Sequence, residues 1–154
     1  MKRLIVIAFV ILLLTGCNNV EEKEKNDYLA MKSKLLEQKN YTDLDDLACD
    51  IIVDVNRVND ENLTYTVELS KASENMHDIE VIVVHNYYTE EVFPTIGLFD
   101  SKRSLYMDTD KKIKLAGTIK STNDIANLNL ELKILIHYTT DEGEEKDIYY
   151  KTTK

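Results

Sequence analysis

The stretch that indicates the fold most clearly is residues 128–152, which read LNLELKILIHYTTDEGEEKDIYYKT. Its first half alternates between apolar side chains and polar or charged ones, which is the period of a strand that buries one face. The acidic run 141–144 contains a glycine and is typical of a hairpin turn, after which the chain returns through Ile148 and Tyr150. This part of the chain therefore predicts two strands joined as an antiparallel hairpin.

The same two-residue period recurs upstream of this hairpin. Polar turns separate the segments that show it, and no helical pattern lies between them after residue 48. The predicted strands, one of them weak, cover residues 49–57, 63–70, 79–85, 95–99, 113–120, 128–138 and 146–152. About seven strands in this arrangement favour an all-β fold, namely an antiparallel β-sandwich that is immunoglobulin-like in architecture. A small closed barrel is the alternative.

A helical pattern precedes the strands. Tyr28, Met31 and Leu35 fall on one stripe of a helix, with lysines and glutamates on its other side. We therefore expect a short helix over residues 27–40 and the β domain over residues 41–154. Residues 18–26 read NNVEEKEKN and offer almost nothing to bury, so we expect them to form a solvated tether.

The N-terminus carries a targeting pattern. Lys2 and Arg3 precede an unbroken apolar run from Leu4 to Leu14. At ~1.5 Å per residue, a helix of this run falls well short of a hydrocarbon core of about 30 Å. The pattern is therefore typical of a signal peptide and not of a membrane span.

The residues that follow specify the kind of signal peptide. Leu14-Thr15-Gly16-Cys17 resembles the lipobox of bacterial lipoproteins, and the resemblance covers residues 1–17 only. It implies that residues 1–16 are removed, that Cys17 carries a diacylglyceryl lipid, and that residues 17–26 form a lipidated N-terminus and tether. Two acyl chains are enough for stable anchoring in a bilayer. The expected location is the extracytoplasmic face of the cell membrane.

Charge narrows the classes of partner. The chain has 154 residues, with 19 Lys and Arg against 28 Asp and Glu, for a net charge of −9. This balance argues against nucleic-acid binding, which depends on cationic side chains. Removal of residues 1–16 takes away Lys2 and Arg3 and no acidic residue, so the charge becomes −11. An anionic bilayer surface repels such a domain, and we expect it to stand away from the membrane.

Residue types that carry catalysis are sparse. Once Cys17 is lipidated, Cys49 is the one remaining thiol, and no histidine is close to it in sequence. If Ile79 faces the core, His85 shares its face, whereas His137 points outward from its own strand, so the two histidines cannot meet on one metal ion. We therefore expect no enzyme activity, no catalytic residues, no metal site and no cofactor.

Acidic turns offer a different binding chemistry. Clusters at 43–46, 108–110 and 141–145 could supply the oxygen ligands that Ca²⁺ prefers, but none has the spacing of an EF-hand. A surface lipoprotein that binds calcium or another ligand is therefore the alternative function.

An aromatic segment is the most unusual part of the chain. Residues 86–107 hold five aromatic side chains and the only proline. Tyrosine combines a large contact area with a polar tip, so Tyr87, Tyr88 and Phe93 are the candidate ligand-binding residues. Neighbouring side chains of a strand point to opposite sides, so one of the two tyrosines should be exposed. The sequence thus predicts a membrane-anchored, non-catalytic binding module whose partner is an envelope protein or a wall ligand.

Overall fold

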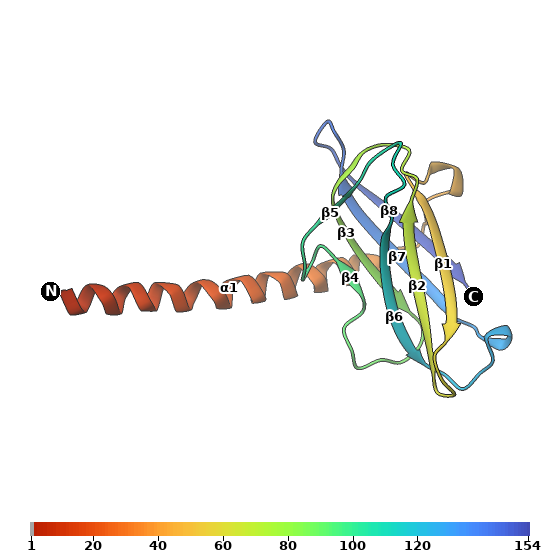
Figure 1. Cartoon of the computed structure of the whole chain (residues 1–154), viewed down its shortest axis with the longest axis horizontal. Coiled ribbons are helices and arrows are strands. Elements are labelled where there is room, and N and C mark those ends of the chain that lie inside the picture. The colour runs from red at the N-terminus through yellow and green to blue at the C-terminus, as the bar shows by residue number, and fades with distance from the viewer. Residues whose placement is uncertain (1) are drawn as a thin grey trace.

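The computed structural model describes the backbone of residues 2–154 and the side chains of residues 20–154. Over the described backbone the protein is mostly β, with one α-helix, two short 3₁₀-helices and eight strands (Figure 1). The helices are α1 (Lys2–Glu37), η1 (Leu44–Asp46) and η2 (Ile125–Asn127). The strands are β1 (Asp50–Arg57), β2 (Asn62–Ser70), β3 (Met76–His85), β4 (Thr95–Ile96), β5 (Arg103–Leu105), β6 (Ile113–Lys120), β7 (Glu131–Thr139) and β8 (Glu145–Thr153).

The strands form two antiparallel sheets. One has the order β1-β2-β6, and the other has the order β4-β3-β7-β8 with β5 also paired to β3. The six longer strands confirm the sequence prediction to within a few residues. The segment 95–99 contributes only the two residues of β4, and β5 was not predicted at all. β5 is three residues long and its pairing with β3 is irregular, so it shows too little alternation to recognise.

Both sheets contribute to one hydrophobic core. Leu132, Ile134 and Ile136 of β7 are fully buried in a cluster that also contains Val67 of β2 and Leu115 of β6. The alternation predicted for residues 128–138 is therefore confirmed, because these apolar side chains face the other sheet. β7 lies between β3 and β8, so it is a central strand of its sheet.

The helix is longer than the sequence led us to expect. α1 is continuous from Lys2 to Glu37, so residues 18–26 are helical and not an irregular tether, and the helix ends before residue 40. Glutamate and lysine are strong helix formers, and Glu21 and Lys25 have the favourable i,i+4 spacing. The prediction of a tether was wrong because it was based on the lack of apolar residues and did not consider the helix propensity of glutamate and lysine. The side chain of Cys17 lies outside the described side chains.

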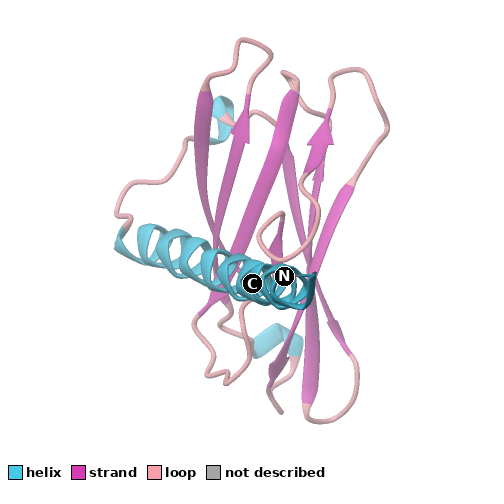
Figure 2. Cartoon of the chain, turned by 90° about the vertical axis from the view of Figure 1, so that its left-hand side faces the viewer, coloured by secondary structure: helices cyan, strands magenta, loops and turns pink. Residues whose placement is uncertain are grey.

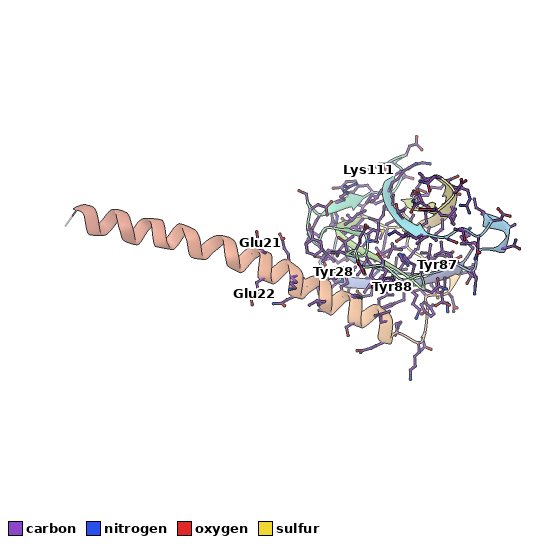
Figure 3. The ribbon with its side chains drawn as sticks, turned by 90° about the horizontal axis from the view of Figure 1, so that it is seen from below. Glu21, Glu22, Tyr28, Tyr87, Tyr88 and Lys111 are labelled. Carbon is purple, nitrogen blue, oxygen red and sulfur yellow. The ribbon has the colours of Figure 1, made fainter. Side chains whose placement is uncertain are left out.

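α1 projects from the domain at one end and packs on it at the other. Glu21 and Glu22 lie on the projecting part, and Tyr28 lies where the helix reaches the domain (Figure 3). Within the part of the chain whose side chains are described, no helix has the length and apolar character that crossing a membrane requires.

The packed part of α1 covers the outer face of the five-stranded sheet, running across its strands (Figure 2). Tyr28, Met31 and Leu35 are buried there against Ile82 of β3 and Leu135 of β7. The predicted helical stripe is therefore confirmed as one buried face. It also explains why β3 is apolar on both sides, since one side faces the core and the other faces the helix.

A polar contact borders this packing. Lys34 of α1 donates a hydrogen bond to Asp147 of β8 over 2.6 Å, and His137 Nδ1 lies 3.0 Å from the same carboxylate. Burial alone raises the pKa of Asp147, but hydrogen bonds from Lys34 and His137 outweigh it and hold the pKa below its usual range. The charged carboxylate therefore helps to attach the helix to the sheet.

Replacing Asp147 with asparagine should lower the free energy of unfolding at pH 7 by up to about 1 kcal/mol. Because the folded-state pKa is depressed, this contribution is present above the ordinary aspartate pKa of about 4 and is lost as the pH falls through the lower folded value. Urea unfolding of both proteins at pH 7 and at pH 3 measures the effect. Asp124→Asn is the control, because its side chain makes no cap hydrogen bond. The difference should be smaller at pH 3 than at pH 7, and an equal difference at the two pH values would contradict the prediction.

Candidate functional site

The main candidate site is a pocket of about 400 Å³ where the two sheets meet the loop between β3 and β4. In Figure 1 this loop is the green segment that leads into β4. The lining combines one residue from each of β2 and β3 with the loop, the start of β4 and the middle of β6, namely Tyr65, His85, Thr89, 91–95 and 115–118. Segments far apart in sequence therefore form its wall.

Three aromatic rings are stacked edge to face at this site. The Tyr65 and His85 rings lie with centroids 5.6 Å apart, and the His85 and Phe93 rings lie 5.0 Å apart. Tyr65 belongs to the three-stranded sheet and His85 to the five-stranded sheet. The ring contacts therefore connect the two sheets and the loop, and they fix the orientation of the imidazole.

Gly117 creates the space for this arrangement. It is the direct antiparallel partner of Tyr65 in the β2–β6 ladder. A Cβ atom at Gly117 would overlap the Tyr65 hydroxyl group and would lie 2.8 Å from Pro94 Cγ. Only glycine therefore lets the Tyr65 ring lie across β6 and lets Pro94 approach the strand.

Two buried polar atoms of the residues that line the pocket have no hydrogen-bond partner. Among the buried side-chain atoms of residues 20–154, Tyr65 Oη and His85 Nδ1 are the ones without a partner in the protein. Tyr65 is fully buried and His85 is 8% exposed. Burial raises the pKa of Tyr65, and burial lowers the pKa of His85, an effect that the backbone of Tyr87 partly offsets. Both groups are therefore neutral at pH 7.

The structure separates the three residues that the sequence proposed as a binding surface. Tyr88 is 83% exposed and donates a hydrogen bond to Glu90 over 3.1 Å. Tyr87 is half-buried against the core. Tyr88 is therefore the exposed member of the pair, which confirms the prediction that one of the two tyrosines is exposed. Phe93 packs beside α1, where Lys32 Nζ lies 5.0 Å from its ring centroid, and of the three it alone lines the pocket.

Sequence reasoning did not assign Tyr65, His85 and Gly117 to one site. It placed His85 on the core face, which the structure confirms, and considered it only as a metal ligand. The one available signal was Gly117, because an isolated glycine inside an alternating strand suggests a close approach of another group. Nothing in the sequence indicates that the approaching group is the Tyr65 hydroxyl.

The other sequence candidates occupy ordinary structural positions. Cys49 is buried, and burial raises its pKa to about 12, so at pH 7 it is a thiol and not a nucleophilic thiolate. In the acidic turn 141–145, Asp141 accepts a hydrogen bond from Asn75 and lies 2.7 Å from His77 Nε2. No group of three His, Cys, Asp or Glu residues with metal-binding geometry exists among the described side chains.

Comparisons of the chain with protein-family models, with curated proteins and with solved structures found no match.

Proposed function

We propose that this chain is a lipid-anchored lipoprotein of the extracytoplasmic membrane face, and that its β domain is a binding module without catalytic activity. The partner is an envelope protein or a wall ligand. The observation that carries the anchor is the Leu14–Cys17 motif after a short apolar run that follows Lys2 and Arg3.

The course of α1 supports this proposal. The helix leads from the cysteine of the motif directly to the domain. From Cys17 to Tyr28, the first residue of the packed face, a helix rises by about 16 Å. The acidic domain is then held a fixed distance from the lipid and is not free on a flexible tether. Repulsion between the domain and anionic headgroups acts in the same direction.

We propose further that the two sheets form an immunoglobulin-like β-sandwich. Supporting this proposal, both sheets are antiparallel and supply buried side chains to one cluster. In such an architecture the loops at the ends of the sheets are free to carry binding groups. The loop over residues 86–94 is one of these, and it forms part of the wall of the pocket.

The anchor proposal makes an all-or-none prediction. Labelled palmitate supplied to bacteria that express the full chain should enter the wild-type protein and should be absent from Cys17→Ala. The reason is that the sulfur atom of Cys17 is the atom that receives the lipid. Gel fluorography of the purified protein measures the label, and the unprocessed variant should also migrate more slowly.

Cys49→Ala is the matched control, because it removes the only other cysteine. Its labelling should equal that of the wild type, since Cys49 is buried in the core. Equal labelling of Cys17→Ala and the wild type would refute the anchor.

A further inference from the structure

We propose that the open edge of β6 binds an extended peptide segment of a partner protein as an added antiparallel strand. The inference rests on the proposed binding function and specifies the partner as an envelope protein with such a segment. Two observations carry it. Backbone groups of β6 have no hydrogen-bond partner among the described residues, and a groove lies beside them.

The hydrogen-bond register identifies the open backbone groups of β6. β6 is the end strand of the order β1-β2-β6, and the N–H of Ser121, directly after it, donates to the Glu61 carbonyl over 2.8 Å. Backbone bonds of an antiparallel pair recur at every second residue pair, so Gly117 bonds to β2. The N–H and C=O groups of Ala116 and Thr118 therefore point away from β2. No strand in the described part of the chain pairs with them.

A groove follows this edge. The pocket of about 400 Å³ has residues 115–118 of β6 on one side and residues 91–95 on the other, and a hollow of about 300 Å³ extends the groove to Lys120. The far side belongs to the other sheet, since the Pro94 carbonyl accepts a hydrogen bond from the N–H of Val83 in β3. In Figure 1, β6 is the strand of its sheet on the side of β4. The groove offers space for a further strand.

The other long edges of the two sheets are partly covered. η2 contacts β1 at the opposite edge of the smaller sheet, and the N–H of Thr42 donates to the Tyr149 carbonyl at the β8 edge. Proteins usually protect such edges, because an open edge is a template for another strand. None of the described residues forms a backbone hydrogen bond with the open side of β6, so this edge is available to a partner.

The lysines of β6 argue against a second copy of this chain as the added strand. Antiparallel pairing of two β6 strands about Gly117 would place Lys114 of each copy opposite Lys120 of the other. Like charges directly opposite each other are destabilising, and lysines are a common means of preventing edges from pairing with themselves. The occupant is therefore a strand with a different pattern of charge.

The charges beside β6 specify that pattern. Lys112 and Lys114 share one carboxylate, that of Glu68, at 2.6 Å and 2.9 Å, so this end of the strand is positive. At the other end the glutamates at 90–91 line the hollow together with Lys120. We therefore expect the added strand to carry an acidic residue opposite Lys114 and a basic residue opposite Lys120.

The side chains of an added strand alternate between the two sides of the sheet. Those opposite Leu115 and Gly117 point toward the pocket, where Val92 and Pro94 supply apolar surface. We expect apolar residues there and polar residues between them. Main-chain hydrogen bonds then supply affinity and the pocket supplies specificity, as in other cases of strand addition.

The test is a titration of the full chain in detergent with the capped peptide Lys-Val-Thr-Val-Thr-Val-Glu. In the antiparallel register its valines face the pocket and its glutamate lies opposite Lys114. In the free protein the amide protons of Ala116 and Thr118 should exchange rapidly with solvent. The peptide should shift their ¹H–¹⁵N signals saturably and slow their exchange. Exchange at Gly117 should change little, because that N–H already bonds to β2.

Backbone methylation of the peptide tests the hydrogen bonds themselves. Methyl groups on the two threonine nitrogens remove the donors that face β6 and should weaken binding at least about tenfold. Methyl groups on two of the valine nitrogens are the matched control, since those nitrogens point away from β6 and binding should be retained. Exchanging the lysine and the glutamate of the peptide should weaken binding at least about threefold.

Ala116→Pro makes the complementary change in the protein. It removes an N–H that has no partner in the strand ladder, and proline is tolerated at such edge positions. Binding of the peptide should fall at least about tenfold. Ala116→Val is the matched control, because it alters the same exposed side chain and keeps the N–H, so it should bind like the wild type.

Four results would overturn the proposal. They are the absence of slower exchange at Ala116 and Thr118 with the peptide at millimolar concentration, equal binding of the peptide methylated on its threonines, and equal binding by Ala116→Pro. The fourth is slow exchange of the same amides without peptide that increases with protein concentration, which would identify a second copy as the occupant. None of these measurements involves Cys17, so their failure leaves the anchor intact, and loss of palmitate labelling leaves the β6 edge intact.

Discussion

Replacing Leu35 with alanine should lower the free energy of unfolding by about 3 kcal/mol. Leu35 is fully buried between α1 and the outer face of the five-stranded sheet, in a cluster with Ile82 and Leu135. The change removes apolar contact area and leaves a cavity that a helix crossing the strands cannot close by a small shift. Urea unfolding followed by far-UV circular dichroism measures the loss.

Leu36→Ala is the matched control, because Leu36 lies one position further along the same helix and is 48% exposed. Its effect should stay within about 0.5 kcal/mol. Amide hydrogen exchange adds a second measurement, since exchange at residues 28–37 should rise in Leu35→Ala more than exchange at β7. Equal effects of the two substitutions would contradict the packing of the helix on the sheet.

Replacing Gly117 with valine should also lower the free energy of unfolding by about 3 kcal/mol. The added side chain would occupy the space of the Tyr65 hydroxyl group and of Pro94 Cγ. Tyr65 has no room to move away, because it is fully buried and in contact with the His85 ring. The strand or the 86–94 loop must therefore shift. Thermal unfolding and the ¹⁵N resonances of His85 report the loss of stability and the displacement.

Ala116→Val is the control for this substitution. It also introduces a valine on the same strand, at an exposed position, although it adds two carbon atoms where Gly117→Val adds three. Valine is favoured in strands, so the stability should be unchanged or slightly higher. If Gly117→Val were as stable as Ala116→Val, the tight packing of Tyr65 over β6 would be wrong.

Most strands could be predicted because their evidence is local. Along β7 and the residue before it, every second side chain from Leu130 to Tyr138 is buried in the core, as the alternation indicated. The buried stripe of α1 was predictable for the same reason, because Tyr28, Met31 and Leu35 recur with the period of a helix. In both cases one segment contains the whole pattern.

Predictions failed where the sequence pattern was short or where two sequence signals pointed to different structures. β5 has three residues and an irregular pairing, so its sequence carries almost no period. Residues 18–26 lack apolar side chains, which suggested a tether, whereas the helix propensity of Glu and Lys prevails in the structure. The packing of α1 on the sheet could not be predicted. The sheet face that α1 covers is formed by strands such as β3 and β7, which are distant from the helix in sequence.

The sequence by itself determined the antiparallel strands, the buried face of the helix, the acidic charge and the motif at Cys17. Only the tertiary structure decided that Tyr65, His85 and Gly117 meet in one pocket and that Phe93 joins them while Tyr88 does not. The physical reason is that a local pattern tells which side of its own strand a residue faces. It does not tell which distant residue lies opposite, because strand pairing and the packing of the two sheets determine that.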